Sequence, residues 1–196
     1  MLEMKNYQFW FCTGSQDLYG QECLDHVAEH SKIMVDRLNK SGILPYEVVW
    51  KPTLLTNAMI RQTFNEANAD ENCAGVITWM HTFSPAKSWI LGLQEYRKPL
   101  LHLHTQFNRE IPYDTIDMDF MNENQSAHGG REFGHIFTRM NIERKVVVGY
   151  WEDEAVQKKI ASWMRTAVGV IESSLDNLVP EKKADWTNYP KGVMWA

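Results

Sequence analysis

A polar segment at residues 117–130 (DMDFMNENQSAHGG) carries the side chains best suited to chemistry in this sequence. Carboxylate, amide and imidazole groups gather here directly ahead of two glycines, and the apolar residues are too few to form a continuous buried stripe. These groups supply the donors and acceptors that hydroxyl groups require. A polar run of this kind at the start of a helix predicts binding of a polyhydroxylated small molecule.

His128 is the residue of this segment that could move a proton at neutral pH, and it lies beside Gly129 and Gly130. Each glycine costs about 1 kcal/mol relative to alanine inside a helix. The glycines could mark a loose first turn or a close helix contact, or they could let a ligand or a partner subunit approach His128. Gln125, three residues earlier, would lie on the same helix face.

Other histidines could form a metal site. His102 and His104 share one face of a predicted strand, because side chains alternate along a strand. Such a pair could bind a metal, or its imidazoles could be hydrogen-bonded within the fold. His81, Asp117 and Asp119 could approach in three dimensions to complete a site. The remaining histidines fall on amphipathic patterns and are expected at the surface or its boundary: His26, His30 and His135.

A glycine-bounded loop at residues 14–20 (GSQDLYG) follows the first apolar run. It lacks the ending of a P-loop and the spacing of a dinucleotide fingerprint, which disfavours a flavodoxin-like nucleotide binder. Gly14 and Gly20 could simply give an ordinary turn its backbone freedom. Gln16 and Tyr19, however, place long polar side chains at a tip where a plain turn would accept Ser or Asp.

Short apolar runs alternate with amphipathic stretches along the chain. The runs predict strands over residues 7–13, 46–50, 73–79, 100–104 and 145–150. The amphipathic stretches predict helices over residues 22–39, 57–69, 84–96, 122–140 and 153–173. Several runs are apolar on both faces, which is typical of strands covered on both sides. The pattern predicts an α/β fold with a doubly wound, mainly parallel sheet of the Rossmann or flavodoxin type and helices on both faces.

This fold constrains where a ligand binds. In an open parallel sheet, ligands lie beyond the carboxyl ends of the strands. The loops at residues 14–20, 81–85 and 105–108 follow three of the predicted strands, and segment 117–130 precedes the next helix. We therefore expect the site at this edge of the sheet, either complete or as a contribution to a larger site.

Composition excludes several classes of function. The net charge is −5, with acids and bases interspersed, so no basic patch exists to bind nucleic acid. No apolar run approaches the length of a membrane span, and no signal peptide is visible at the start of the sequence. The three cysteines lack metal-type spacing and are expected to be reduced thiols of a cytoplasmic protein.

Five runs of the sequence closely resemble L-arabinose isomerase. They are residues 9–20 (FWFCTGSQDLYG), 75–87 (GVITWMHTFSPAK), 98–108 (KPLLHLHTQFN), 116–122 (IDMDFMN) and 125–129 (QSAHG). The likeness covers residues 5–174 and matches only the first of the family's three domains. It implies an aldose–ketose isomerase that interconverts L-arabinose and L-ribulose, often together with D-galactose and D-tagatose.

The resemblance also implies roles for particular residues. Gln16, Leu18 and Tyr19 correspond to the family's first sugar-contacting loop, and Gln125 and His128 correspond to the second. In the family, this domain lends these residues to the active site of an adjacent subunit, so a homo-oligomer with its site at a subunit interface is expected. Mn²⁺ is the expected cofactor. The family's metal-ligating and catalytic residues lie in the later domains, however, so this chain's metal ligands are unassigned and it could lack a bound metal.

Two hypotheses follow. The leading one is a short, homo-oligomeric isomerase in which residues 1–174 form the α/β domain and His128 transfers the proton. His81, His104, Asp117 and Asp119 are reserve candidates for proton transfer or for a metal site. Residues 175–196 do not match the family and are expected to form an extended segment that packs against a neighbour or the sheet. The rival is a non-catalytic module that folds, oligomerises and binds sugar.

Overall fold

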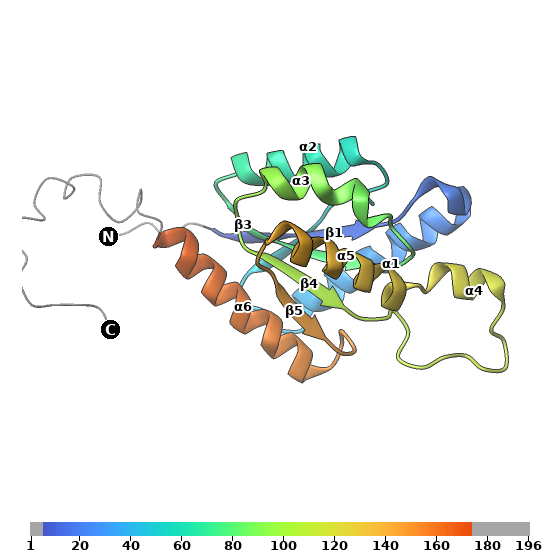
Figure 1. The fold of residues 1–196 in the computed structure, drawn as a ribbon. Coiled ribbons are helices and arrows are strands. Elements are labelled where there is room, and N and C mark those ends of the chain that lie inside the picture. Colours follow the sequence, from blue (N-terminus) through green and yellow to red (C-terminus); the bar gives the residue numbers. More distant parts are fainter. Residues whose placement is uncertain (1–5, 174–196) are drawn as a thin grey trace, which may run out of the picture.

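A computed structural model describes residues 6–173 of the chain and shows a five-stranded parallel sheet (Figure 1). The strands stand in the order β2-β1-β3-β4-β5. Their bounds are Gln8–Gly14 for β1, Glu47–Trp50 for β2, Cys73–Met80 for β3, Leu100–His104 for β4 and Lys145–Val148 for β5. The predicted doubly wound α/β fold is confirmed. The predicted extended segment at residues 175–196 lies outside the described residues.

Helices cover both faces of the sheet (Figure 1). On one face, α1 (Gly20–Lys40) and α6 (Glu154–Glu172) pack over one apolar core. On the other, α2 (Asn57–Ala69), α3 (Ile90–Glu95) and α5 (Ser126–Met140) pack over a second. The two sides of β1 show why the strands read as continuous apolar runs. Phe9 and Phe11 enter the first core, whereas Trp10 and Cys12 enter the second.

Two predicted helices are interrupted in the structure. The helix expected over residues 84–96 begins as a 3₁₀ turn, Ala86–Trp89, before α3. The helix expected over residues 122–140 is two helices, α4 (Met118–Glu123) and α5. They separate because the Gln125 N–H bonds the carbonyl of His81 at 2.9 Å instead of a carbonyl within its own helix. A bond to a distant strand end therefore overrides the local helical pattern.

Cys12, Cys23 and Cys73 are free thiols in the structure. Burial raises the pKa of the Cys73 thiol to about 11 and that of Cys12 further still. These thiols are therefore protonated and unreactive at neutral pH. Among residues 6–173, no helix combines the length and apolar character that crossing a membrane requires.

Candidate functional site

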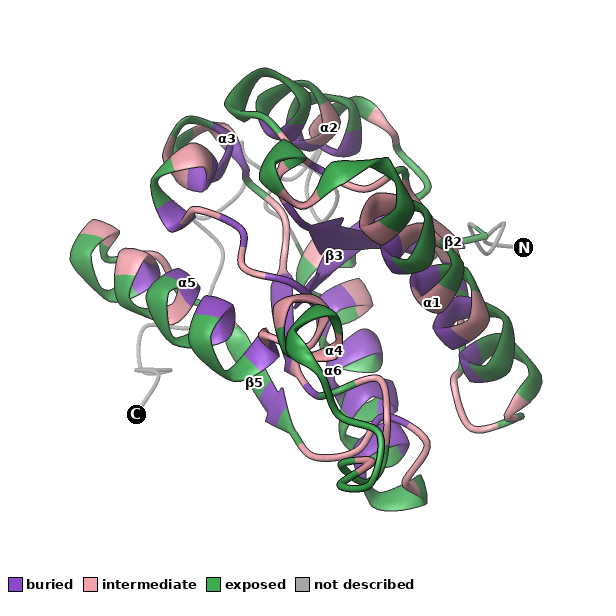
Figure 2. Cartoon of the chain, turned by 90° about the vertical axis from the view of Figure 1, so that its right-hand side faces the viewer, coloured by how far each residue is buried: buried purple, intermediate pink, exposed green. Residues whose placement is uncertain are grey.

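α4 lies over the carboxyl edge of the sheet, between α1 and α5 (Figure 2). The loop after β1 reaches the same edge, where the hydroxyl groups of Ser15 and Thr82 share a hydrogen bond, with 2.7 Å between Ser15 Oγ and Thr82 Oγ1. The segment after β3 joins α5 there through the bond between Gln125 N–H and His81 O. Residues from four parts of the chain therefore converge at the edge that the fold predicts for ligand binding.

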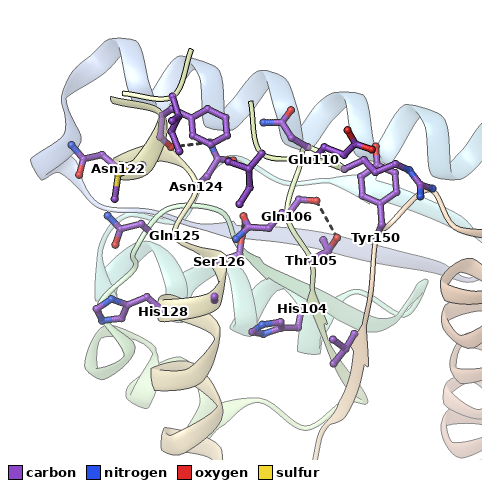
Figure 3. Close-up of a pocket in the computed structure, with 18 of the residues that line it drawn as sticks. His104, Thr105, Gln106, Glu110, Asn122, Asn124, Gln125, Ser126, His128 and Tyr150 are labelled. Atoms are coloured by element: carbon purple, nitrogen blue, oxygen red, sulfur yellow. Dashed lines mark hydrogen bonds between the residues drawn. The ribbon is translucent and has the colours of Figure 1, made fainter. Parts of the chain in front are cut away.

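A pocket of about 810 Å³ opens at this edge beneath α4 and the loop before it (Figure 3). Gln125 and His128 lie on one side of it, Gln106 and Ser126 at its centre and Tyr150 opposite. Ser126 Oγ donates a hydrogen bond to Gln106 Oε1 at 3.1 Å, which holds these two side chains in place at the centre of the pocket. Within the described structure, no hydrogen bond occupies the side-chain amide of Gln125. That amide is therefore available to a ligand's hydroxyl groups.

His128 stands at the rim of the pocket with a largely exposed imidazole, 63 % accessible. Its Nε2 lies 3.9 Å from Glu132 Oε1, one helical turn further along α5. Its ring tilts against Phe83 at a centroid distance of 4.9 Å. The exposed imidazole has a carboxylate near it, which suits a group that exchanges protons. Its catalytic role remains a prediction.

The loop at residues 14–20, which contains the first set of predicted sugar contacts, lies elsewhere along the carboxyl edge of the sheet. Of the described residues that line the pocket, none is Gln16, Leu18 or Tyr19. Leu18 points into solvent and is 84 % exposed. Within one chain, the structure therefore brings Gln125 and His128 together but leaves the other three predicted sugar contacts outside their pocket.

The two loop glycines have different roles. Gly20 has a φ of 80°, so it provides the backbone freedom expected of it. Gly14 is needed for space instead, because a Cβ there would lie 2.7 Å from both Met80 Sδ and Trp89 Cζ2.

Gly129 and Gly130 are explained by close packing of α5 on the sheet. A Cβ on Gly129 would lie 3.2 Å from the carbonyl of Thr82, and one on Gly130 would lie 2.5 Å from His104 Nδ1. Both glycines are buried, while His128 faces outward. Of the three interpretations offered by the sequence, the structure supports the close helix contact.

The four reserve residues do not converge on a site. Asp117 caps α4, and Asp119 is exposed on the first turn of the same helix. His104 lies at the base of the pocket under Gly130, and burial lowers its pKa, with Arg131 adding to the effect. His81 lies elsewhere, directly after β3.

His81 instead belongs to a cluster that the sequence analysis missed. His30 Nδ1 lies 2.8 Å from His81 Nε2 and 3.0 Å from Glu123 Oε1. The third distance, from His81 Nε2 to Glu123 Oε1, is 3.5 Å. The ring of His81 stacks on Trp79, and the ring of His30 stacks on Phe107 at a centroid distance of 3.7 Å. Three elements, α1, the end of β3 and α4, thus hold one group of side chains.

Electrostatics fix the charge of two members of the cluster. Burial lowers the pKa of His81 below its ordinary value of 6.5, so this imidazole is neutral at pH 7. The imidazole of His30, followed by that of His81, holds the pKa of the Glu123 carboxyl well below its ordinary 4.5. An ionised carboxylate therefore lies against a neutral, buried imidazole.

A signal for this cluster was present in the sequence. His30 was expected at the surface or its boundary, and it does lie at the boundary, with 23 % of its side chain accessible. It falls three residues after Val27 and four before Met34, both fully buried on α1. That helical spacing turns His30 toward the sheet, where His81 follows a buried strand.

The cluster is a poor match for Mn²⁺. Two imidazoles and one carboxylate form the group of potential ligands found among the described residues. Manganese is best served by carboxylate, carbonyl and water oxygens, whereas imidazole nitrogens suit later transition metals. The described residues therefore do not supply the manganese site that the family resemblance would call for.

Asp117 has a structural role that can be tested. Its side chain accepts a hydrogen bond from the Phe120 N–H at 2.8 Å, the N-cap interaction of α4. We expect Asp117→Ala to destabilise α4 by about 1 kcal/mol. Amide hydrogen exchange should show faster exchange at Phe120, and Asp117→Asn should restore protection because an amide oxygen also caps. Unchanged exchange in the alanine variant would contradict this role.

Comparison with known proteins places the chain in a family. The family model described as the L-arabinose isomerase N-terminal domain matches residues 3–175. The chain is 62 % identical over 173 residues to the L-arabinose isomerase of Geobacillus thermodenitrificans, covering 88 % of this chain and 35 % of the relative.

Two other L-arabinose isomerases match similarly. Identity is 60 % over 172 residues with that of Halalkalibacterium halodurans, again 88 % of this chain and 35 % of the relative. It is 63 % over 167 residues with that of Phocaeicola vulgatus, 85 % of this chain and 33 % of the relative. The chain thus spans about a third of the length of these relatives. It belongs to the L-arabinose isomerase family, whose N-terminal domain it matches.

Proposed function

We propose that this chain provides the sugar-binding part of an aldose–ketose isomerase, which interconverts L-arabinose and L-ribulose and, as a second pair, D-galactose and D-tagatose. The observation that carries the proposal is the pocket at the carboxyl edge of the sheet, with Gln125 and His128 on one side. Amide, hydroxyl and imidazole groups in one pocket suit a polyhydroxylated ligand. The names of the relatives point to L-arabinose as the sugar, and the other three sugars follow from the family resemblance.

In this proposal, His128 is the catalytic residue. Isomerisation moves a proton between neighbouring carbons while a carbonyl and a hydroxyl exchange roles. The exposed imidazole of His128 removes the proton from one carbon and returns it to the next. Gln125 holds a sugar hydroxyl beside it. The enediolate oxygens formed between these two steps require stabilisation by groups from outside this chain.

A second copy of the chain completes the site in a homo-oligomer. Large apolar side chains stand exposed on and beside α4, among them Tyr113 at 81 %, Met118 at 65 % and Met121 at 53 %. Leu18 on the first loop is also exposed, at 84 %. Apolar surface around a polar pocket is typical of a protein interface. Gln16, Leu18 and Tyr19 would then reach the pocket of a neighbouring subunit. A cytoplasmic location fits the unpaired cysteines.

A non-catalytic sugar-binding or oligomerisation module is the second candidate. The poor match of the described residues to Mn²⁺ favours it, because the family's metal chemistry is then unsupported within this chain. The two candidates share the pocket and the oligomer, and they differ only in turnover.

The purified 196-residue chain can distinguish them. We expect L-arabinose binding by calorimetry, an oligomer by light scattering, and L-ribulose formation in a colorimetric assay, with and without Mn²⁺ or EDTA. Binding without turnover under all conditions would select the non-catalytic module. If the chain binds none of the four sugars, the isomerase proposal and the sugar-binding module are both overturned, and if it also forms no oligomer, the oligomerisation module is overturned as well.

Variants test the two pocket residues. Gln125→Ala should weaken sugar binding by about 3–10-fold, the value of one hydrogen bond. His128→Gln should abolish any turnover while changing affinity little. Gln62→Ala, an exposed amide on α2 bonded to Glu66, and His135→Gln, on the outer face of α5, are the matched controls and should change neither. Unchanged turnover in His128→Gln would remove its catalytic assignment.

A further inference from the structure

The cluster of His30, His81 and Glu123 has no role in the proposed sugar chemistry. None of its members is among the described residues that line the sugar pocket. Yet it brings two imidazole nitrogens and a carboxylate oxygen within 4.8 Å of one another. We propose that His30 Nδ1, His81 Nε2 and Glu123 Oε1 bind one Zn²⁺ ion. This proposal stands whether or not the chain acts on sugar.

The spacing of the three atoms fits a small tetrahedral ion. Ligand atoms about 2.0–2.1 Å from Zn²⁺ at tetrahedral angles lie about 3.3 Å apart. The observed separations are 2.8, 3.0 and 3.5 Å. The ligands would therefore need to move by only a few tenths of an ångström to admit the ion. Two histidines and one glutamate with an open fourth position form a known zinc ligand set.

One oxygen of the Glu123 carboxylate is left unsatisfied by residues 6–173. Glu123 Oε1 is buried and has no hydrogen bond of acceptable geometry among these residues, although an imidazole nitrogen of His30 and one of His81 lie within 3.5 Å. A buried acceptor in this state costs free energy that a bound ligand can recover. A cation at the common centre of the three atoms would satisfy the oxygen and both nitrogen lone pairs together.

Aromatic stacking holds the imidazole rings of His30 and His81 in position to bind the ion. Trp79 stacks on His81 with an interplanar angle of 16°, and Phe107 stacks on His30 at 9°. Aromatic neighbours of this kind fix ring orientation and exclude water from the ion. The side chains of His30 and Glu123 keep 23 % and 16 % of their surface accessible, so the site is open to an ion from solution.

A bound ion would join α4 to the body of the domain. Glu123 ends α4, His30 is on α1, and His81 follows β3. Gln125, two residues after Glu123, is tied to the carbonyl of His81. The ion would thus fix the start of the segment that forms the wall of the sugar pocket.

Calorimetry on the EDTA-stripped full chain tests the proposal directly, with Zn²⁺ alone as the ligand and no sugar present. We expect one Zn²⁺ per chain and a rise in the melting temperature. Co²⁺ in place of Zn²⁺ should give the intense visible bands of a tetrahedral site. Glu123→Gln and His30→Gln should each weaken binding by more than about 100-fold, because even a partner that only orients a ligand costs about 10–100-fold.

Glu132→Gln is the matched control. Glu132 and His128 form an exposed histidine–glutamate pair on α5, and this variant should bind Zn²⁺ as the unmodified chain does. Circular dichroism confirms folding, and two variants are used so that a misfolded one does not decide the result. The proposal is overturned if the unmodified chain binds no stoichiometric Zn²⁺. It is also overturned if folded Glu123→Gln or His30→Gln binds unchanged, or if Glu132→Gln alone loses binding.

Discussion

Replacing Gly130 with valine is expected to lower the free energy of unfolding by about 3 kcal/mol or more, the upper end of the cost of overpacking. A Cβ at this position would lie 2.5 Å from His104 Nδ1 and 3.0 Å from His102 Nε2. Valine would add two more methyl groups to the same space. α5 would have to move away from β4, carrying the wall of the pocket with it.

Chemical denaturation measures this effect, and Gly134→Val on the same helix is its matched control. A Cβ on Gly134 would meet only the guanidinium end of Arg144, at 3.0 Å, which can move at little cost. We expect that variant to stay within about 0.5 kcal/mol of the unmodified chain. If Gly130→Val were equally stable but lost sugar binding, Gly130 would serve the ligand rather than the packing of α5.

The sheet could be predicted from sequence because its central strands are buried on both faces. Residues 73–80 form a continuous apolar run, and every residue of β3 is buried. A run of this kind needs helices on both sides, and the sequence contains amphipathic stretches between all the runs. Strand–helix alternation then fixes the parallel order with few alternatives. The edge at which the loops gather follows from the same topology.

The finer features depend on contacts that no local pattern contains. The break between α4 and α5 comes from the bond between Gln125 N–H and the carbonyl of His81, 44 residues earlier in the chain. Glu123 is one polar residue among many in its segment. Only the docking of α4 against α1 brings it to His30. Sequence spacing places side chains on a face, but it does not determine which faces meet.

His102 shows how burial decides between two interpretations of a histidine pair. Its Nδ1 lies 3.2 Å from Thr78 Oγ1, whose hydroxyl also lies 3.2 Å from the carbonyl of Leu101. If Thr78 donates to Leu101, its oxygen accepts the proton of His102 Nδ1, and Nε2 keeps its lone pair. Nε2 is buried without a hydrogen-bond partner in the described structure. His102 is therefore a neutral core residue hydrogen-bonded within the fold.

The buried environment of His102 makes the free energy of unfolding depend on pH. Burial lowers the pKa of His102 from 6.5 to about 3, with the positive charges of His104 and Arg144 adding to the effect. The unfolded chain takes up a proton near pH 6.5, whereas the folded chain does not until the pH is far lower. Stability from the neutral imidazole is thus complete above pH 6.5 and is lost as the pH falls toward 3. The slope for one histidine is about 1.4 kcal/mol per pH unit.

His102→Asn should flatten this dependence. We expect denaturation curves in EDTA between pH 6.5 and 5 to show a slope shallower by up to about 1.4 kcal/mol per pH unit, although the variant is less stable at pH 7. His81 and His104 also have lowered pKa values, so part of the slope should remain. The carboxyl of Glu123 titrates below its ordinary pKa of 4.5 and stays outside this pH window.

His135→Asn, on the exposed face of α5, is the control and should leave the slope unchanged. Equal slopes in the unmodified chain and His102→Asn would show that folding does not shift the pKa of His102, and its assignment as a neutral core residue would fail.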